Sequence, residues 1–518
     1  MHMFMAIRRY ISLLACAVLM TALFAFADDV VPKVSCQLES NCKLDIERGH
    51  SDEASMLSVA RSKPADMVPE GRSKAWVEFP NGSAITDLPG LPTGASRKLR
   101  MASGYIPIPG DKQLFYVFVE SQGSPSKDPL LLWTNGGPGC SGMLGFMTEM
   151  GPLRPTANGD LELNPHAWTK FANMVFIEQP AGVGFSKPVS NFEYTDEAAA
   201  ADNWEFIKGF LKIYPQLKEN DFWLTSESYG GHYVPTLAWE ILSHNNGEVN
   251  FQGLIIGNPL IYLPYTNHGQ MAIYNAWGIM PDPVYFQYVN DDCAFLDDYG
   301  KPMKSNMSRR AIESCITLRS QFYRLTHDMD PYALGFPKCS TNEVDAMMQH
   351  LRPQWYRHSR LKRMVPEKYS PCADSFAIRF LNKPDVQKAM HVQGSTSWAP
   401  CSGGVRYSRS SVNSNMVPVI KGLIEHGGLR IMIMSGTEDS VCAHLGDQRW
   451  IWDTGYKTTQ PWGPYKLDGQ VAGFTANFTA ENGAGFRYTT VLGAGHMIPS
   501  TQPKRGSHIV KQFLSGDW

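Results

Sequence analysis

The strongest indication of the fold is Leu224-Thr225-Ser226-Glu227-Ser228-Tyr229-Gly230-Gly231, because these residues join the end of an apolar strand to the start of a helix. The strand is Asp221–Thr225, and Gly230–His244 carries apolar residues at helical spacing. A serine between such elements sits on a sharp turn that lifts its hydroxyl above the sheet. The usual pattern is G-x-S-x-G, and Ser226 replaces its first glycine. The turn predicts that Ser228 is a nucleophile, although an ordinary strand-to-helix turn has the same local pattern.

The same alternation of strand and helix extends on both sides of this turn. The predicted strands are continuous apolar or alternating runs at Gln113–Glu120, Leu130–Thr134, Asn173–Glu178, Gln252–Ile256, Arg430–Met434 and Arg487–Leu492. The other predicted helices are Asp196–Ile213, Ser375–Val392 and Gly506–Leu514. Alternating strands and helices imply a mostly parallel central sheet flanked by helices. With the serine turn, this pattern predicts an α/β-hydrolase fold.

Two segments depart from this alternation. Residues 262–375 lack buried strand runs and are rich in Tyr, Met, Pro and Cys, which indicates an inserted, mainly helical, disulfide-bonded lid. The N-terminus has the pattern of a cleaved signal peptide: basic Arg8-Arg9, the apolar run Ile11–Ala27, and small residues in Ala25-Phe26-Ala27. An uncleaved anchor is the alternative. The predicted organisation is a signal peptide at 1–27, an N-terminal extension or pro-segment (hence a zymogen) at 28–95, the core at 96–261 and 376–518, and the lid at 262–375.

The composition excludes several classes of function. The 518 residues carry a formal net charge of −2, whereas an electrostatic nucleic-acid binder needs a basic excess. No second stretch is long and apolar enough to span a bilayer, so the mature chain is expected in the secretory pathway without a membrane span. Three sequons begin at Asn81, Asn306 and Asn477 and predict surface glycosylation.

The secretory context changes how the ten cysteines are interpreted. Cys16 leaves with the signal peptide, and none of the remaining nine forms a tight CxxC pair. Disulfides are therefore expected and a metal site is not. Because nine is odd, one thiol is expected to stay free.

A nucleophilic serine needs a base, and the order Ser…Asp…His is expected in an α/β hydrolase. Asp439 follows the strand at 430–434, and His496 follows the strand at 487–492, so both lie at carboxyl ends of strands. Glu438 is the rival for the acidic role. The loop after Leu130–Thr134 supplies further groups: the backbone N–H groups of Gly137 and of Tyr229 are the predicted oxyanion-hole donors.

Three motifs in this order carry a resemblance to a known family. They are W-T-N-G-G-P-G-C-S (133–141), E-S-Y-G-G-H-Y (227–233) and G-A-G-H-M-I-P (493–499). Together they resemble the serine carboxypeptidase family over about Gly104 to Trp518. The resemblance implies an enzyme that releases C-terminal amino acids from peptides through an acyl-enzyme, with no metal or organic cofactor.

The resemblance also assigns the substrate's terminal carboxylate to Asn135, Glu149 and Glu227, with help from the Gly136 backbone. A carboxylate accepts no hydrogen bond from another carboxylate unless one carries a proton. Two glutamates in a cleft repel, so one pKa rises and a proton is shared. Binding is then favoured in acid, which suits a lysosome or vacuole, although a secreted enzyme fits the signal peptide equally. Whether the chain is a monomer or a homodimer stays open.

The family likeness sorts the cysteines as well. It implies Cys140–Cys401 between the oxyanion loop and the core, nested lid pairs Cys293–Cys372 and Cys315–Cys339, and Cys36–Cys42 in the extension. Cys442 is then the free thiol, near the site. Two departures from the family pattern are Ser226 and Thr437, where the family has Gly and Asp.

Two other functions stay open at this stage. An acyltransferase on the same scaffold would alter the Asn135 loop and the residue before the serine, and this chain keeps Asn135 and Glu227. A non-enzymatic partner protein would not need the complete Ser, Asp and His set. The sequence does not determine the preferred substrate side chains; the aromatic- and Met-rich lid favours hydrophobic ones.

Overall fold

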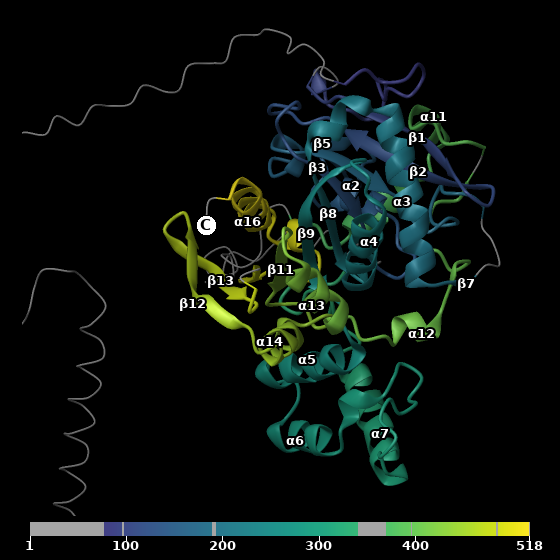
Figure 1. Ribbon diagram of the computed structural model, residues 1–518. Helices are drawn as coiled ribbons and strands as arrows, with labels where there is room; N and C mark the ends of the chain where they lie inside the picture. Colours follow the sequence, from purple (N-terminus) through teal and green to yellow (C-terminus); the bar gives the residue numbers. More distant parts are fainter. Residues whose placement is uncertain are drawn as a thin grey trace, which may run out of the picture. The chain divides into compact units, whose positions relative to one another are not determined.

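The computed structural model describes residues 77–95, 98–188, 193–339, 369–394, 396–482 and 485–516 (Figure 1). The predicted signal peptide and the predicted Cys36–Cys42 pair lie outside the described residues. Within the described part of the chain, no helix is both long and apolar enough to cross a bilayer.

The central feature is a ten-stranded mixed sheet with the order β1-β2-β6-β3-β8-β9-β11-β14-β13-β12. The strands from β6 to β14 in this order pair parallel, and the two edges are antiparallel. The strands are β1 Met101–Ile108, β2 Lys112–Val119, β3 Leu130–Thr134, β6 Asn173–Ile177, β8 Asp221–Ser228, β9 Asn250–Pro259, β11 Arg430–Gly436, β12 Lys457–Leu467, β13 Gln470–Thr479 and β14 Gly485–Val491. Two short pairs lie outside this sheet: β4 Leu153–Pro155 with β5 Leu161–Leu163, and β7 Glu193–Tyr194 with β10 Arg406–Tyr407.

Helices cover both faces of the sheet and make two separate apolar layers. One layer contains side chains of α3 Asp196–Ile213, α4 Gly230–His244, α13 Val417–His426 and α14 His444–Asp453. The other contains side chains of α2 Met143–Thr148, α10 Ala373–Leu381, α11 Pro384–Ala389 and α16 Pro503–Ser515. Every residue of β3 and β6 is buried between these layers, which is why both strands are continuous apolar runs. The predicted α/β-hydrolase fold is confirmed.

The predicted helix over Ser375–Val392 is two helices, α10 and α11. Pro384 opens the second one, because proline has no N–H to donate and its ring clashes with the preceding turn. The hairpin of β12 and β13 was not predicted. Most residues of β12 are exposed and two of them are prolines, so the strand lacks the alternation of a half-buried strand.

Residues 77–95 were assigned to the N-terminal extension, but the structure packs them against the core. Val77, Ile85 and Leu88 are buried, and Ala84 forms a bridge with Ala102 of β1. The core therefore begins earlier than residue 96.

The lid carries α5 Leu263–Ala276, α6 Asp282–Asn290 and α7 Arg309–Leu325, and Figure 1 shows the three helices together below the sheet. The structure contains the disulfides Cys293–Cys315 and Cys339–Cys372. The predicted nested pairs Cys293–Cys372 and Cys315–Cys339 were wrong. Cys293 and Cys315 are buried in one apolar cluster of the lid, whereas Cys372 lies immediately before α10 of the core.

The three predicted glycosylation sites have different surroundings. Asn81 and Asn306 are exposed. Asn477 lies in β13, where its amide donates to Gln460 and its carbonyl accepts from Arg487. A glycan on Asn477 would replace one hydrogen of the same Nδ2 that donates to Gln460, whereas Asn81 and Asn306 are exposed.

Candidate active site

Ser228 is the last residue of β8, and α4 begins two residues later. Its φ is +59°, a left-handed conformation that a non-glycine residue rarely adopts. Such strain is typical of a nucleophile on a sharp strand-to-helix turn. Ser226 fits in place of the usual glycine because its Oγ donates to the Thr134 carbonyl at 2.6 Å. Gly230 must then stay small, since a Cβ there would lie 2.0 Å from that Oγ.

His496 and Asp439 form a buried pair, with Nδ1 of the histidine 2.7 Å from Oδ2 of the aspartate. Asp439 also accepts from the backbone N–H groups of Val441 at 2.7 Å and Cys442 at 3.2 Å. The rival Glu438 instead accepts from the backbone of Gly335 in the lid, and burial raises its pKa to about 7. The structure therefore brings Asp439, and not Glu438, to His496.

Asn258, which no sequence motif predicted, joins the loops of Asp439 and His496. It lies near the end of β9, is fully buried and has a φ of +40°. Its amide donates to the carbonyls of Gly495 and His496, and its carbonyl accepts from Gly436 N at 2.7 Å. Two residues on, the N–H of Leu260 donates to the Ser228 carbonyl. The end of β9 thus contacts all three predicted catalytic loops. The one sequence signal for this role is that Asn258 precedes a proline.

Asn135, Glu149 and Glu227 meet in one buried cluster. The Asn135 amide donates to Glu149 Oε1 at 3.0 Å and to Glu227 Oε1 at 2.9 Å. Its carbonyl accepts from Trp133 Nε1 and Gly145 N, which fixes the direction in which the amide points. The second carboxylate oxygen of each glutamate is buried, and among the described residues no donor outside the pair contacts it.

Burial governs the protonation of this pair. It raises the pKa of Glu149 to about 7, against the hydrogen bonds from Asn135 and Glu227. Burial also raises the pKa of Glu227 well above its usual range, and the neighbouring charge of Glu149 adds to the effect. Ionising both of two adjacent carboxyls in a buried site has a high free-energy cost, so the pair holds at least one proton through mildly acidic pH.

The predicted oxyanion loop lies against the serine turn. A Cβ on Gly136 would be 2.4 Å from the Tyr229 backbone N, so only glycine allows this approach. Gly137 has a φ of +115°, which also favours glycine. The Cys140–Cys401 disulfide and a Ser141 N–H bond to Pro400 anchor the loop to the returning core.

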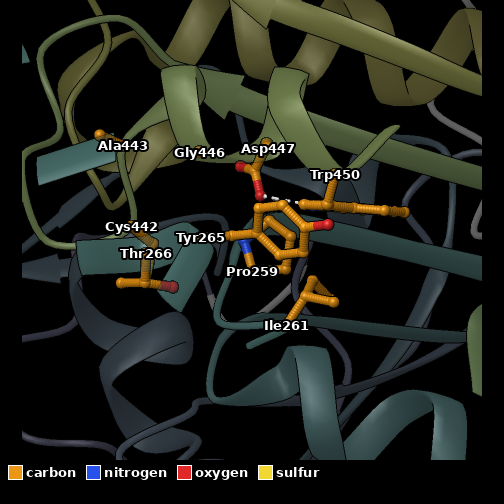
Figure 2. Close-up of a pocket in the computed structure, with 9 residues that line it drawn as sticks. All are labelled: Pro259, Ile261, Tyr265, Thr266, Cys442, Ala443, Gly446, Asp447 and Trp450. Atoms are coloured by element: carbon orange, nitrogen blue, oxygen red, sulfur yellow. Dashed lines mark hydrogen bonds between the residues drawn. The ribbon is translucent and has the colours of Figure 1, made fainter. Parts of the chain in front are cut away.

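Cys442 is a buried free cysteine, and its thiol hydrogen-bonds with the Ser228 side chain. Burial raises its pKa well above the usual range, and the charge of Asp439 adds to this. The thiolate is the reactive form, so this thiol is protected. Cys442 also lines a small pocket with Tyr265 and Trp450, drawn in Figure 2. The pocket has no space for a water molecule, so it is a packing gap.

Comparisons with known proteins agree with this geometry. The family described as serine carboxypeptidase matches residues 89–516. Serine carboxypeptidase-like 34 of Arabidopsis thaliana is 31% identical over 83% of this chain and 88% of its own length. Serine carboxypeptidase-like 44 of the same plant is 33% identical over 85% of this chain and 91% of its own length. The crystal structure of Kex1, a prohormone-processing carboxypeptidase from Saccharomyces cerevisiae, has a TM-score of 0.66 at 21% identity, over 84% of this chain and 95% of that one, and supports the fold. The chain belongs to the serine carboxypeptidase family and is a peptide hydrolase.

Proposed function

We propose that the chain releases C-terminal amino acids from peptides through an acyl-enzyme, and that it works best in acid. The observation that supports this is the buried cluster of Asn135, Glu149 and Glu227. Its member Glu227 directly precedes Ser228 in the chain. A peptide with a free carboxylate, bound there, presents its last peptide bond to Ser228.

In this proposal Ser228 attacks the carbonyl of that bond. His496 takes the serine proton and passes it to the leaving amino acid, and Asp439 orients the histidine and stabilises its positive form. The N–H groups of Gly137 and Tyr229 bind the tetrahedral oxyanion. Water then attacks the acyl-enzyme, with His496 again as the base, and releases the shortened peptide.

The Glu149 and Glu227 pair makes the enzyme selective for a substrate with a free terminal carboxylate. In its protonated form the pair donates a hydrogen bond to a carboxylate, and the Asn135 amide adds a second donor. As pH rises through about 7, the pair gains negative charge and repels the same group. The substrate is therefore an uncapped peptide C-terminus.

An oxidising compartment fits the described cysteines, of which six form three disulfides. We infer a secretory-pathway enzyme, located in a lysosome or vacuole or secreted.

The test compares an N-blocked dipeptide with the same dipeptide carrying a C-terminal amide. The wild-type protein is expected to release the free amino acid from the first at acidic pH and to cleave the amide far more slowly. Ser228→Ala is expected to abolish both this activity and labelling by a fluorophosphonate. Equal rates on the acid and the amide would refute recognition of the carboxylate, and labelling that survives in Ser228→Ala would refute the assignment of the nucleophile.

A further inference from the structure

The E-S-Y-G-G-H-Y motif contains two side chains, His232 and Tyr233, that the proposed reaction does not use. Both are buried, in the first turns of α4 directly after Tyr229. Tyr229 itself presents its backbone N–H to the proposed oxyanion, while its side chain points into the core and is fully buried. These three residues therefore lie behind the oxyanion hole.

A buried carboxylate, Asp196, holds this group together. It is the first residue of α3, and its Oδ1 accepts from the hydroxyls of Tyr229 at 3.0 Å and Tyr407 at 2.9 Å. Its Oδ2 lies 3.0 Å from Nδ1 of His232, and the histidine must be the donor because a carboxylate only accepts. Among the described residues, no lysine or arginine pairs with Asp196. Three hydrogen bonds and the N-terminus of an 18-residue helix stabilise the charge instead.

The ring of Tyr229 is held on several sides. It stacks on His232 at a centroid distance of 4.5 Å and an angle of 9°. Tyr233 and Tyr407 meet it edge-on, at 5.0 Å and 5.4 Å. Burial and the charge of Asp196 raise the pKa of Tyr229 above its usual range, so its hydroxyl remains a donor at all working pH values. A ring held in this way leaves its own backbone little freedom to rotate.

The same group also bears on the other half of the proposed oxyanion hole. The Tyr233 hydroxyl accepts from Gly139 N at 3.0 Å, and the Gly139 carbonyl accepts from Ser402 N at 2.9 Å. Gly139 lies in the loop that carries Gly137, the second predicted oxyanion donor. The two donors of the hole are thus attached to one buried cluster, Tyr229 through its own ring and the Gly139 loop through Tyr233, whose ring packs edge-on against that of Tyr229.

We propose that Asp196 and His232 are positioning residues for the oxyanion hole, holding the Tyr229 ring so that its backbone N–H stays aimed beside that of Gly137. The proposal rests on the proposed function, in which these two N–H groups stabilise the tetrahedral oxyanion. Oxyanion donors act only where they are held in place before the reaction, and a displacement of about 1 Å can cost about 100-fold in rate. Loss of the group is therefore expected to lower kcat while substrate binding is retained.

The experiment measures kcat and KM on an N-blocked dipeptide for Asp196→Asn, Tyr229→Phe and the double variant. Each single change is expected to lower kcat about 10-fold with KM changed less than about twofold. Because Asp196 acts through the Tyr229 hydroxyl, the double variant is expected to lose little more than the worse single variant. Tyr229→Phe removes only a hydroxyl, so it keeps the proposal testable if Asp196→Asn does not fold.

Tyr214→Phe is the matched control. This change also removes a buried tyrosine hydroxyl, which lies 3.0 Å from the hydroxyl of Tyr116. Tyr214 itself lies in the apolar core that packs on β2. The thermal midpoint of this variant is expected to fall while its kcat stays within about twofold of wild type. If Asp196→Asn and Tyr229→Phe behave like this control, the group only packs the core and the proposal is overturned.

A second readout separates this proposal from the proposed function. The rate of fluorophosphonate labelling at Ser228 depends on the oxyanion hole, because the phosphoryl oxygen occupies it, but it needs no peptide carboxylate. Labelling is expected to slow about 10-fold in Asp196→Asn and Tyr229→Phe, even if the protein releases no amino acid from dipeptides. Unchanged labelling rates in folded variants would overturn the positioning role, whereas slowed labelling without any dipeptide hydrolysis would overturn only the carboxypeptidase proposal.

Discussion

Glu227→Gln tests the carboxylate pair most directly. In the wild type, a pKa of about 7 at Glu149 means that the first proton of the pair leaves near neutrality. Because this pKa is raised, the protonated pair that binds the substrate is fully populated in acid, and its population falls as pH rises. The protonated fraction falls from about nine-tenths at about pH 6 to about one-tenth at about pH 8. The KM for an N-blocked dipeptide is therefore expected to rise about tenfold across this interval, with kcat nearly constant.

A glutamine at position 227 keeps a hydrogen-bond donor beside Asn135 but removes the shared proton. We expect the rise in KM between about pH 6 and about pH 8 to shrink to less than about threefold. The assay compares the dipeptide with an N-blocked ester that has no free carboxylate. The ester is expected to show no such rise in either protein. Glu205→Gln, at a partly exposed position paired with Lys208, is the matched control and is expected to keep the wild-type profile.

Two results would contradict this account of the pH dependence. If ester and dipeptide hydrolysis lose activity together in the wild type, the pH effect does not arise from the glutamate pair. If Glu227→Gln keeps the full tenfold rise in KM, Glu227 does not share the proton that binds the substrate.

Three further predictions follow from the described contacts. Asn258→Ala leaves the buried Gly436 N–H without its partner, so we expect this variant to be less stable by about 1–3 kcal/mol and to have a lower kcat. A destabilised variant with an unchanged kcat would show that Asn258 does not position the loops of Asp439 and His496. A thiol-reactive aromatic disulfide is expected to modify Cys442 slowly in the native protein and rapidly after unfolding, and rapid native modification would contradict its burial and raised pKa. Non-reducing peptide mapping is expected to find the lid bridges as Cys293–Cys315 and Cys339–Cys372, and a peptide linking Cys293 to Cys372 would contradict the structure.

Much of the core was predictable because its signals are local. Leu130–Thr134, Asp196–Ile213 and Gly230–His244 have the predicted bounds, since a strand buried on both faces and an amphipathic helix each leave a pattern in consecutive residues. The hairpin of β12 and β13 leaves no such pattern. Its long outer strand is mostly exposed, and packing against β14 through β13 stabilises it.

The sequence alone predicts the serine turn and the order of Ser228, an acidic residue at Glu438 or Asp439, and His496. A parallel sheet brings the carboxyl ends of its strands to one edge, so strand order along the chain already implies that these loops meet. The packing of distant loops brings Asp439, and not its neighbour Glu438, to His496, and it reveals Asn258 and the Asp196 group behind Tyr229. The reason is geometric. Which of two adjacent carboxylates reaches a histidine, or which tyrosines share one aspartate, depends on how loops separated by many residues pack, and no periodic pattern of side chains records that.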